Sequence, residues 1–99
     1  MPTITKKKTS RYEAHGKAAE IRKIYNTTQW RKLRAAYLLE HPLCEDCLDR
    51  DEVREAVEVH HVRPISTGYD TDQMKTIAYD ADNLVALCAE CHHKRHGKR

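Results

Sequence analysis

The sequence predicts one small α+β domain with N-terminal helices, stabilised by a metal ion as well as by apolar packing. Its 99 residues allow one domain and exclude a second. Residues 28–40 have the apolar spacing of a helix, the stretches 55–61 and 84–87 have the pattern of strands, and two Cys pairs flank the strands. With 39% hydrophobic residues, 33% charged residues and no Phe, burial of apolar side chains alone stabilises such a chain only weakly.

Charge is unevenly distributed along the chain. Residues 1–34 carry ten Lys and Arg against two Glu, a local net charge of +8, whereas the overall net charge is +3. Residues 1–10 are polar and lysine-rich, and we predict a disordered basic arm there, followed by a folded domain over 11–99. Basic ends beside an acidic middle are typical of a protein that binds nucleic acid, although basic termini are also common as plain solvated tails.

The N-terminal half predicts two helices. Residues 14–25 have the composition of a weak helix, and a stronger one is expected from about residue 28 to residue 40, with a Thr cap before it and Pro42 after it. Three large apolar side chains recur there at helical spacing and should pack on the core rather than stack on bases: Trp30, Leu33 and Tyr37.

The C-terminal half predicts two strands and a last helix. Residues 55–61 alternate in type, so the adjacent His60 and His61 must face opposite ways. On this pattern one side carries Val57, Val59 and His61, and the other carries Ala56, Glu58 and His60. The polar stretch 66–82 is predicted to be a long loop with some local structure, 84–87 a buried strand, and the residues after Cys91 a short helix ending near residue 96.

Two C-x-x-C pairs indicate a structural zinc site. The spacing lets both thiolates of each pair reach one tetrahedral ion, and the ligands would be Cys44, Cys47, Cys88 and Cys91. Such a site is coordinatively closed, so it would stabilise the fold without performing chemistry. Two disulfides, a redox-active pair and unrelated buried thiols are the alternatives. Because the sequence has neither a secretory leader nor a long apolar run, we expect a soluble, cytoplasmic protein in which metal is favoured over disulfides.

The remaining polar motifs are similar to those of a known family. They are His60-His61-Val62-Arg63-Pro64-Ile65, then Asn83-Leu84-Val85-Ala86-Leu87-Cys88, then Cys91-His92. This pattern resembles the HNH endonuclease family over about residues 28–97, because the helix from Trp30 and the first Cys pair also match phage-type members. The departures are that Ile65 stands where Leu is common and His60 stands where some members have Asp. The resemblance implies a ββα-metal fold, also called the His-Me finger.

The resemblance also implies roles for individual residues. Carried over by position, His60 and His92 would bind a catalytic divalent metal, His61 would be the general base, and Asn83 would fix the loop or ring carrying that base. His96 lies four residues after His92 on the predicted helix, so it is a plausible third ligand. All-histidine ligation favours Zn²⁺, Ni²⁺, Co²⁺ or Mn²⁺, although phosphate and water oxygens could complete a Mg²⁺ shell. Arg63 and Arg95 are candidates for holding the phosphate.

Two classes of function follow from these motifs. The first is a metal-dependent endonuclease that nicks or cuts double-stranded DNA, as a monomer or a dimer. Small members of this kind are often encoded by phages or prophages near terminase genes, which would imply a phage terminase as partner and a role in DNA packaging; a restriction or defence nuclease is an alternative. The second class is a zinc-stapled nucleic-acid-binding module without catalysis, which would have no need of His61 and Asn83.

Overall fold

The structure is a computed structural model that describes residues 16–97. The predicted basic arm over residues 1–10 and the start of the first predicted helix lie outside the described residues. A first helix covers 16–25 in the described part. The elements that follow are α2 (Thr28–Glu40), α3 (Glu45–Asp49), β1 (Glu58–His61), η1 (Ile65–Thr67), α4 (Thr71–Ala78), η2 (Ala81–Asn83), β2 (Leu84–Leu87) and α5 (Ala89–Gly97).

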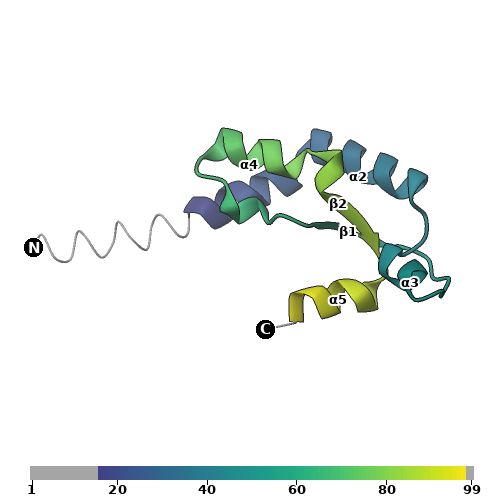
Figure 1. Cartoon of the computed structure of the whole chain (residues 1–99). Helices are drawn as coiled ribbons and strands as arrows, with labels where there is room; N and C mark the ends of the chain where they lie inside the picture. The colour runs from purple at the N-terminus through teal and green to yellow at the C-terminus, as the bar shows by residue number, and fades with distance from the viewer. Residues whose placement is uncertain (1–15, 98–99) are drawn as a thin grey trace, which may run out of the picture.

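A two-stranded antiparallel hairpin lies at the centre of the described fold, with α2 and α5 on opposite faces (Figure 1). Strand β1 pairs with β2 so that Glu58 lies opposite Leu87 and His61 opposite Leu84. Since successive side chains of a strand point to opposite faces, His61 shares a face with Leu84, and His60 shares the other face with Val85. The predicted α+β class, with a ββα unit at its centre, is therefore confirmed.

Three small clusters of buried side chains form the core. Helix α2 contributes Trp30 and Tyr37, which pack on Leu84 and Ala86 of β2, with Leu33 partly buried beside them. The second cluster joins the first helix to η1 and α4, and its members are Ile24, Ile65, Met74, Ile77 and Ala78. The third consists of the four cysteines and Leu87. The predicted apolar face of α2 is confirmed, and so is its Thr cap, because the Thr27 hydroxyl accepts a hydrogen bond from the Trp30 amide.

The predicted strand over 55–61 is too long. Pairing with β2 begins only at Glu58, while Glu55 instead forms an isolated bridge with Leu43. The side-chain alternation therefore breaks before β1: Ala56 is buried with Trp30, whereas Val57 is 47% exposed. The backbone before β1 does not continue the strand, because it hydrogen-bonds with the segment before the first Cys pair. The Cys44 amide donates to the Arg54 carbonyl, and the Ala56 amide donates to the Pro42 carbonyl.

The prediction for 66–82, a loop with some local structure, misses a regular helix, because the stretch contains the eight-residue helix α4. Asp70 caps this helix by accepting a hydrogen bond from the Gln73 amide. Three of its residues, Met74, Ile77 and Ala78, fall at helical spacing and are buried. The helix thus arises from a local cap and a short apolar face that the surrounding polar residues obscured.

Among the described residues, no helix is long and apolar enough to span a membrane.

Candidate active site and zinc cluster

The four cysteines meet in one buried cluster at the end of the hairpin. Their Sγ atoms all lie within 4.8 Å of one another, and no cysteine is more than 4% exposed. The Sγ of Cys47 lies 3.9 Å from that of Cys88 and 3.7 Å from that of Cys91. A tetrahedral ion with Zn–S bonds of ~2.3 Å would separate its sulfurs by about 3.8 Å. All four thiols are unbridged, so the cluster fits a structural zinc ion and argues against the disulfide alternative.

Backbone and side-chain donors surround these sulfurs. The amides of Cys47 and Cys91 donate to the sulfurs of Cys44 and Cys88, each at 3.4 Å. The Arg50 guanidinium donates to the sulfurs of Cys47 and Cys91 at 3.6 and 3.7 Å. Four thiolates on a divalent ion carry a net negative charge, and the Arg50 cation partly compensates for it.

Three histidines form a second cluster on the α5 face of the hairpin. His60 on β1 and His92 and His96 on α5 bring one ring nitrogen each within 4.8 Å of the others. The Nε2 atoms of His92 and His96 are 3.0 Å apart. Ligand nitrogens on one ion at ~2.1 Å lie about 3.0 to 3.4 Å apart when adjacent, so these rings fit a shared divalent metal. His96, which lies four residues after His92 on α5, joins the cluster as its spacing predicts.

Burial disfavours the protonated form of His60 and His92, and metal ligation requires unprotonated imidazoles. Desolvation, together with the nearby His96 and Arg95, lowers the pKa of His60 to about 4. Desolvation also lowers the pKa of His92, with a further contribution from His96. The Glu58 carboxylate lies 3.8 Å from Nδ1 of His92, the ring nitrogen opposite the one that faces His96. A carboxylate at this position helps to orient a liganding ring.

His61 occupies the opposite face of the hairpin and is only 7% exposed. Its ring lies against that of Trp30, with centroids 4.8 Å apart, and its Nε2 is 3.0 Å from the carbonyl oxygen of Ala78. Because a carbonyl only accepts hydrogen bonds, Nε2 must carry the hydrogen, and the lone pair is left on Nδ1. Burial lowers the pKa of His61, although the bond to Ala78 opposes this shift. The ring is thus held as a neutral base in one tautomer.

Asn83 locks the turn that follows His61. Its side-chain oxygen accepts from the Arg63 amide at 2.8 Å, and its nitrogen donates to the carbonyl oxygens of Arg63 and Ile77 at 3.0 and 3.2 Å. Ile77 directly precedes Ala78, whose carbonyl holds the His61 ring. Asn83 therefore fixes both the loop after His61 and the end of α4, whose Ala78 carbonyl orients the His61 ring.

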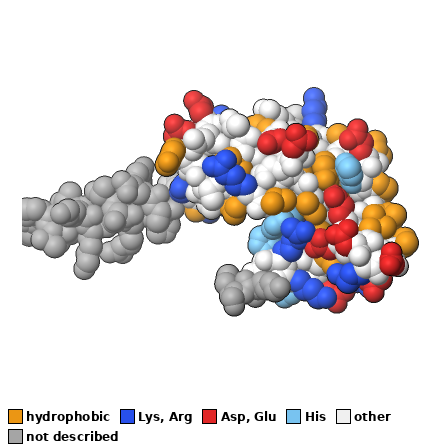
Figure 2. Space-filling model, in the orientation of Figure 1, with side chains coloured by type: hydrophobic (Ala, Val, Ile, Leu, Met, Phe, Trp, Pro, Cys, Tyr) orange, Lys and Arg blue, Asp and Glu red, His pale blue; other side chains and the backbone are white. Residues whose placement is uncertain are grey.

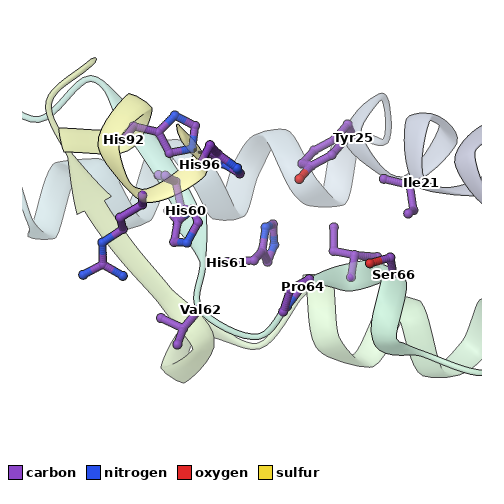
Figure 3. A pocket seen from close by; sticks show the side chains of 12 residues that line it. Ile21, Tyr25, His60, His61, Val62, Pro64, Ser66, His92 and His96 are labelled. Carbon is purple, nitrogen blue, oxygen red and sulfur yellow. Dashed lines mark hydrogen bonds between the residues drawn. The ribbon is translucent and has the colours of Figure 1, made fainter. Parts of the chain in front are cut away.

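One pocket of about 440 Å³ joins the histidines of both faces (Figure 3). It is lined by His60, His92 and His96 and also by His61. Figure 2 shows His side chains beside Lys and Arg side chains at the hollow between α5 and the rest of the molecule. Three histidines at metal-ligand spacing and a separately oriented imidazole therefore border the same cavity, an arrangement that suits hydrolysis at a metal.

The two candidate phosphate-binding arginines differ in position. Arg95 lines the pocket, but its guanidinium forms two hydrogen bonds with the Asp46 carboxylate of α3, at 2.9 and 2.7 Å. Arg63 does not line the pocket; its side chain donates to the Thr67 hydroxyl at 3.1 Å. Sequence reasoning missed Tyr25 and Ile21, which line the pocket from the first helix. No motif marks these two residues, because the fold alone brings their helix to the site.

Comparison with known proteins identifies this arrangement. A family model described as HNH endonuclease matches residues 44–98, more than half of the chain. The chain belongs to the HNH endonuclease family. Members of this family are metal-dependent phosphodiester hydrolases, so the chain is an enzyme of that class. No curated protein matches it significantly.

A solved HNH endonuclease has the same fold. The crystal structure of the HNH endonuclease of the deep-sea thermophilic bacteriophage GVE2 with manganese ion is 28% identical to this chain. The match covers 89% of this chain and 90% of that one, with a TM-score of 0.77. The structural match extends beyond residues 44–98 of the present HNH endonuclease. It therefore includes part of the N-terminal helical region that the family model leaves out.

Loss of one cysteine should unfold this HNH endonuclease. Structural zinc contributes roughly 10 kcal/mol in small zinc domains, which is comparable to the whole stability of a domain, about 5 to 15 kcal/mol. Cys44→Ser and Cys91→Ser are therefore expected to lose zinc and the cooperative unfolding transition, as measured by metal content and circular dichroism. His61→Ala is the control and should keep one zinc per chain. Soluble, folded and zinc-free cysteine variants would reject the assignment of a structural zinc.

Proposed function

We propose that this protein is a DNA endonuclease whose general base is His61 and whose catalytic divalent metal is held by His60, His92 and His96. The observation that carries this proposal is the shared pocket, which joins three imidazoles at ligand spacing to a fourth, separately oriented imidazole. A nucleic-acid-binding module without catalysis would need neither the separately oriented ring of His61 nor the hydrogen bonds of Asn83 that help to orient it.

His61 would take the proton from the attacking water at Nδ1. Its bond to the Ala78 carbonyl leaves the lone pair on that atom, and its lowered pKa keeps the ring unprotonated at neutral pH. Asn83 acts as a positioning residue here, because it holds the two segments that orient the ring.

The three other histidines fit a divalent metal in number and spacing, and burial lowers the pKa of His60 and His92. Such a metal, when bound, stabilises negative charge that develops on the phosphate and its leaving oxygen. All-nitrogen ligation favours Mn²⁺, Ni²⁺, Co²⁺ or Zn²⁺, with Mg²⁺ dependent on additional oxygen ligands. The relative crystallised with manganese supports this range of metals.

DNA is the substrate that the charges favour. Lys94 and Arg95 lie in the last turn of α5, Arg95 also lines the pocket, and residues 1–34 add a net charge of +8. Cations of this kind supply sequence-independent affinity for the phosphate backbone. Arg95 would have to exchange part of its contact with Asp46 for a phosphate, and Arg63 would contact a phosphate outside the pocket.

Similarity to a bacteriophage enzyme supports a role in phage DNA processing. A terminase partner and a role in DNA packaging stay predictions, as does action as a monomer or a dimer. A restriction or defence role would use the same chemistry on different DNA.

Nicking of supercoiled plasmid tests the proposed function. The purified protein, incubated with Mg²⁺, Mn²⁺, Ni²⁺ or Zn²⁺, should convert supercoiled DNA to nicked circles, and EDTA should abolish the reaction. His61→Ala should lower the rate by about 10²-fold or more, as expected for loss of a general base. His41→Ala is the matched control, since His41 is exposed at the end of α2 and outside the pocket. Equal activity of the His61→Ala variant would refute the role of His61; intact DNA binding without cleavage would favour the binding-module alternative.

The pH dependence of cleavage should reflect the lowered pKa of His61. The base works in its neutral form, and burial lowers its pKa below the ordinary value of 6.5. As pH falls, kcat/KM should therefore hold through pH 6.5 and decline only at more acidic pH. The measurement is a kcat/KM profile at saturating metal, accompanied by circular dichroism at each pH. An acidic limb centred above pH 6.5 would contradict a buried neutral base.

A further inference from the structure

The pocket extends beyond the metal and the base, between the first helix and η1. Ile21 and Tyr25 line it from the helix over 16–25, and Pro64, Ile65 and Ser66 line it from the opposite side (Figure 3). None of these residues is a metal ligand in either cluster. This part of the cavity is largely apolar, with hydroxyl groups from Tyr25 and Ser66.

The first helix is firmly attached to the catalytic domain. Ile24 is 1% exposed and packs with Ile65 of η1 and with Ile77 and Ala78 of α4. The same α4 presents the Ala78 carbonyl to His61. Because Tyr25 directly follows Ile24, its position relative to the base is set by this packing. The pocket wall it forms is therefore a fixed feature of the fold.

Tyr25 lies next to the base and remains accessible. Its ring makes edge contacts with those of His61 and Trp30, with centroids 6.0 and 5.7 Å apart, yet the residue is 43% exposed. Figure 3 shows its hydroxyl end directed toward the space beside His61. Among the described residues the hydroxyl has no hydrogen-bond partner. Burial raises the pKa of the phenol, which stays a neutral donor.

We propose that Tyr25 is a substrate-contacting residue whose hydroxyl donates a hydrogen bond to a phosphodiester oxygen of the DNA strand being cut. This inference rests on the proposed function. Tyr hydroxyls are regular phosphate donors in protein–DNA complexes. A strand whose scissile phosphate lies between His61 and the three metal-binding histidines can continue into the adjoining part of the same pocket. There Ile21 and Ile65 can contact the deoxyribose carbons, and Tyr25 offers its hydroxyl as a donor.

Tyr25→Phe removes the hydroxyl and keeps the ring that packs on Trp30 and His61. A hydrogen bond to a charged oxygen is worth about a 10-fold change in affinity or more. The variant should therefore raise KM for a short DNA duplex about 10-fold with kcat nearly unchanged, because the contact exists in the ground state as well as in the transition state. Since the phenol is neutral, the slope of log KM against log salt concentration should not change.

Tyr69→Phe is the matched control, because Tyr69 is 90% exposed and lies outside this pocket. An unchanged KM for Tyr25→Phe would overturn the proposal. So would a fall in kcat at constant KM, because Tyr25 would then act through His61 rather than on the substrate. If the wild-type protein itself failed to cleave DNA, the proposed function would fail first, and duplex affinity measured in EDTA would still test the Tyr25 contact on its own.

Discussion

The antiparallel pairing of β1 with β2 is the constraint on which the site depends. In a strand, adjacent residues point to opposite faces, so the pairing of β1 with β2 places His60 and His61 on opposite faces of the hairpin. His60 then meets α5 and its two histidines, while His61 meets Trp30 and the end of α4. A shift of the pairing by one residue would exchange the two rings and destroy both environments.

So short a hairpin is held in register at both ends. At one end the cysteine cluster ties Cys88, directly after β2, to the first Cys pair and to α5. At the other end Asn83, directly before β2, bonds the backbone of Arg63 and Ile77. Two isolated strands of four residues would be marginal in water. The cysteine cluster and Asn83 thus fix the strands that carry the histidines.

Much of this could be predicted from the sequence, because the signals were local. Matched Cys pairs, the adjacent His60 and His61, and the helical spacing of His92 and His96 each depend on a few neighbouring residues. The helix α4 was missed because its apolar face is short and embedded in polar residues. The contributions of Ala78, whose backbone orients the base, and of Tyr25, which reaches the pocket from a distant helix, carry no local signal at all. Both arise from tertiary packing.

The central claim is that the hairpin places His60 on one face as a metal ligand and the adjacent His61 on the other face as the base. Long-range ¹H–¹⁵N NMR of the histidine rings tests it most directly, recorded on the zinc-stapled protein during titration with further Zn²⁺ as a diamagnetic ion for the catalytic site. The account predicts that ring nitrogens of His60, His92 and His96 shift on metal binding, while His61 stays in the Nε2–H tautomer with an unprotonated, metal-free Nδ1. Metal-induced shifts at the His61 nitrogens, or an Nδ1–H tautomer there, would contradict it.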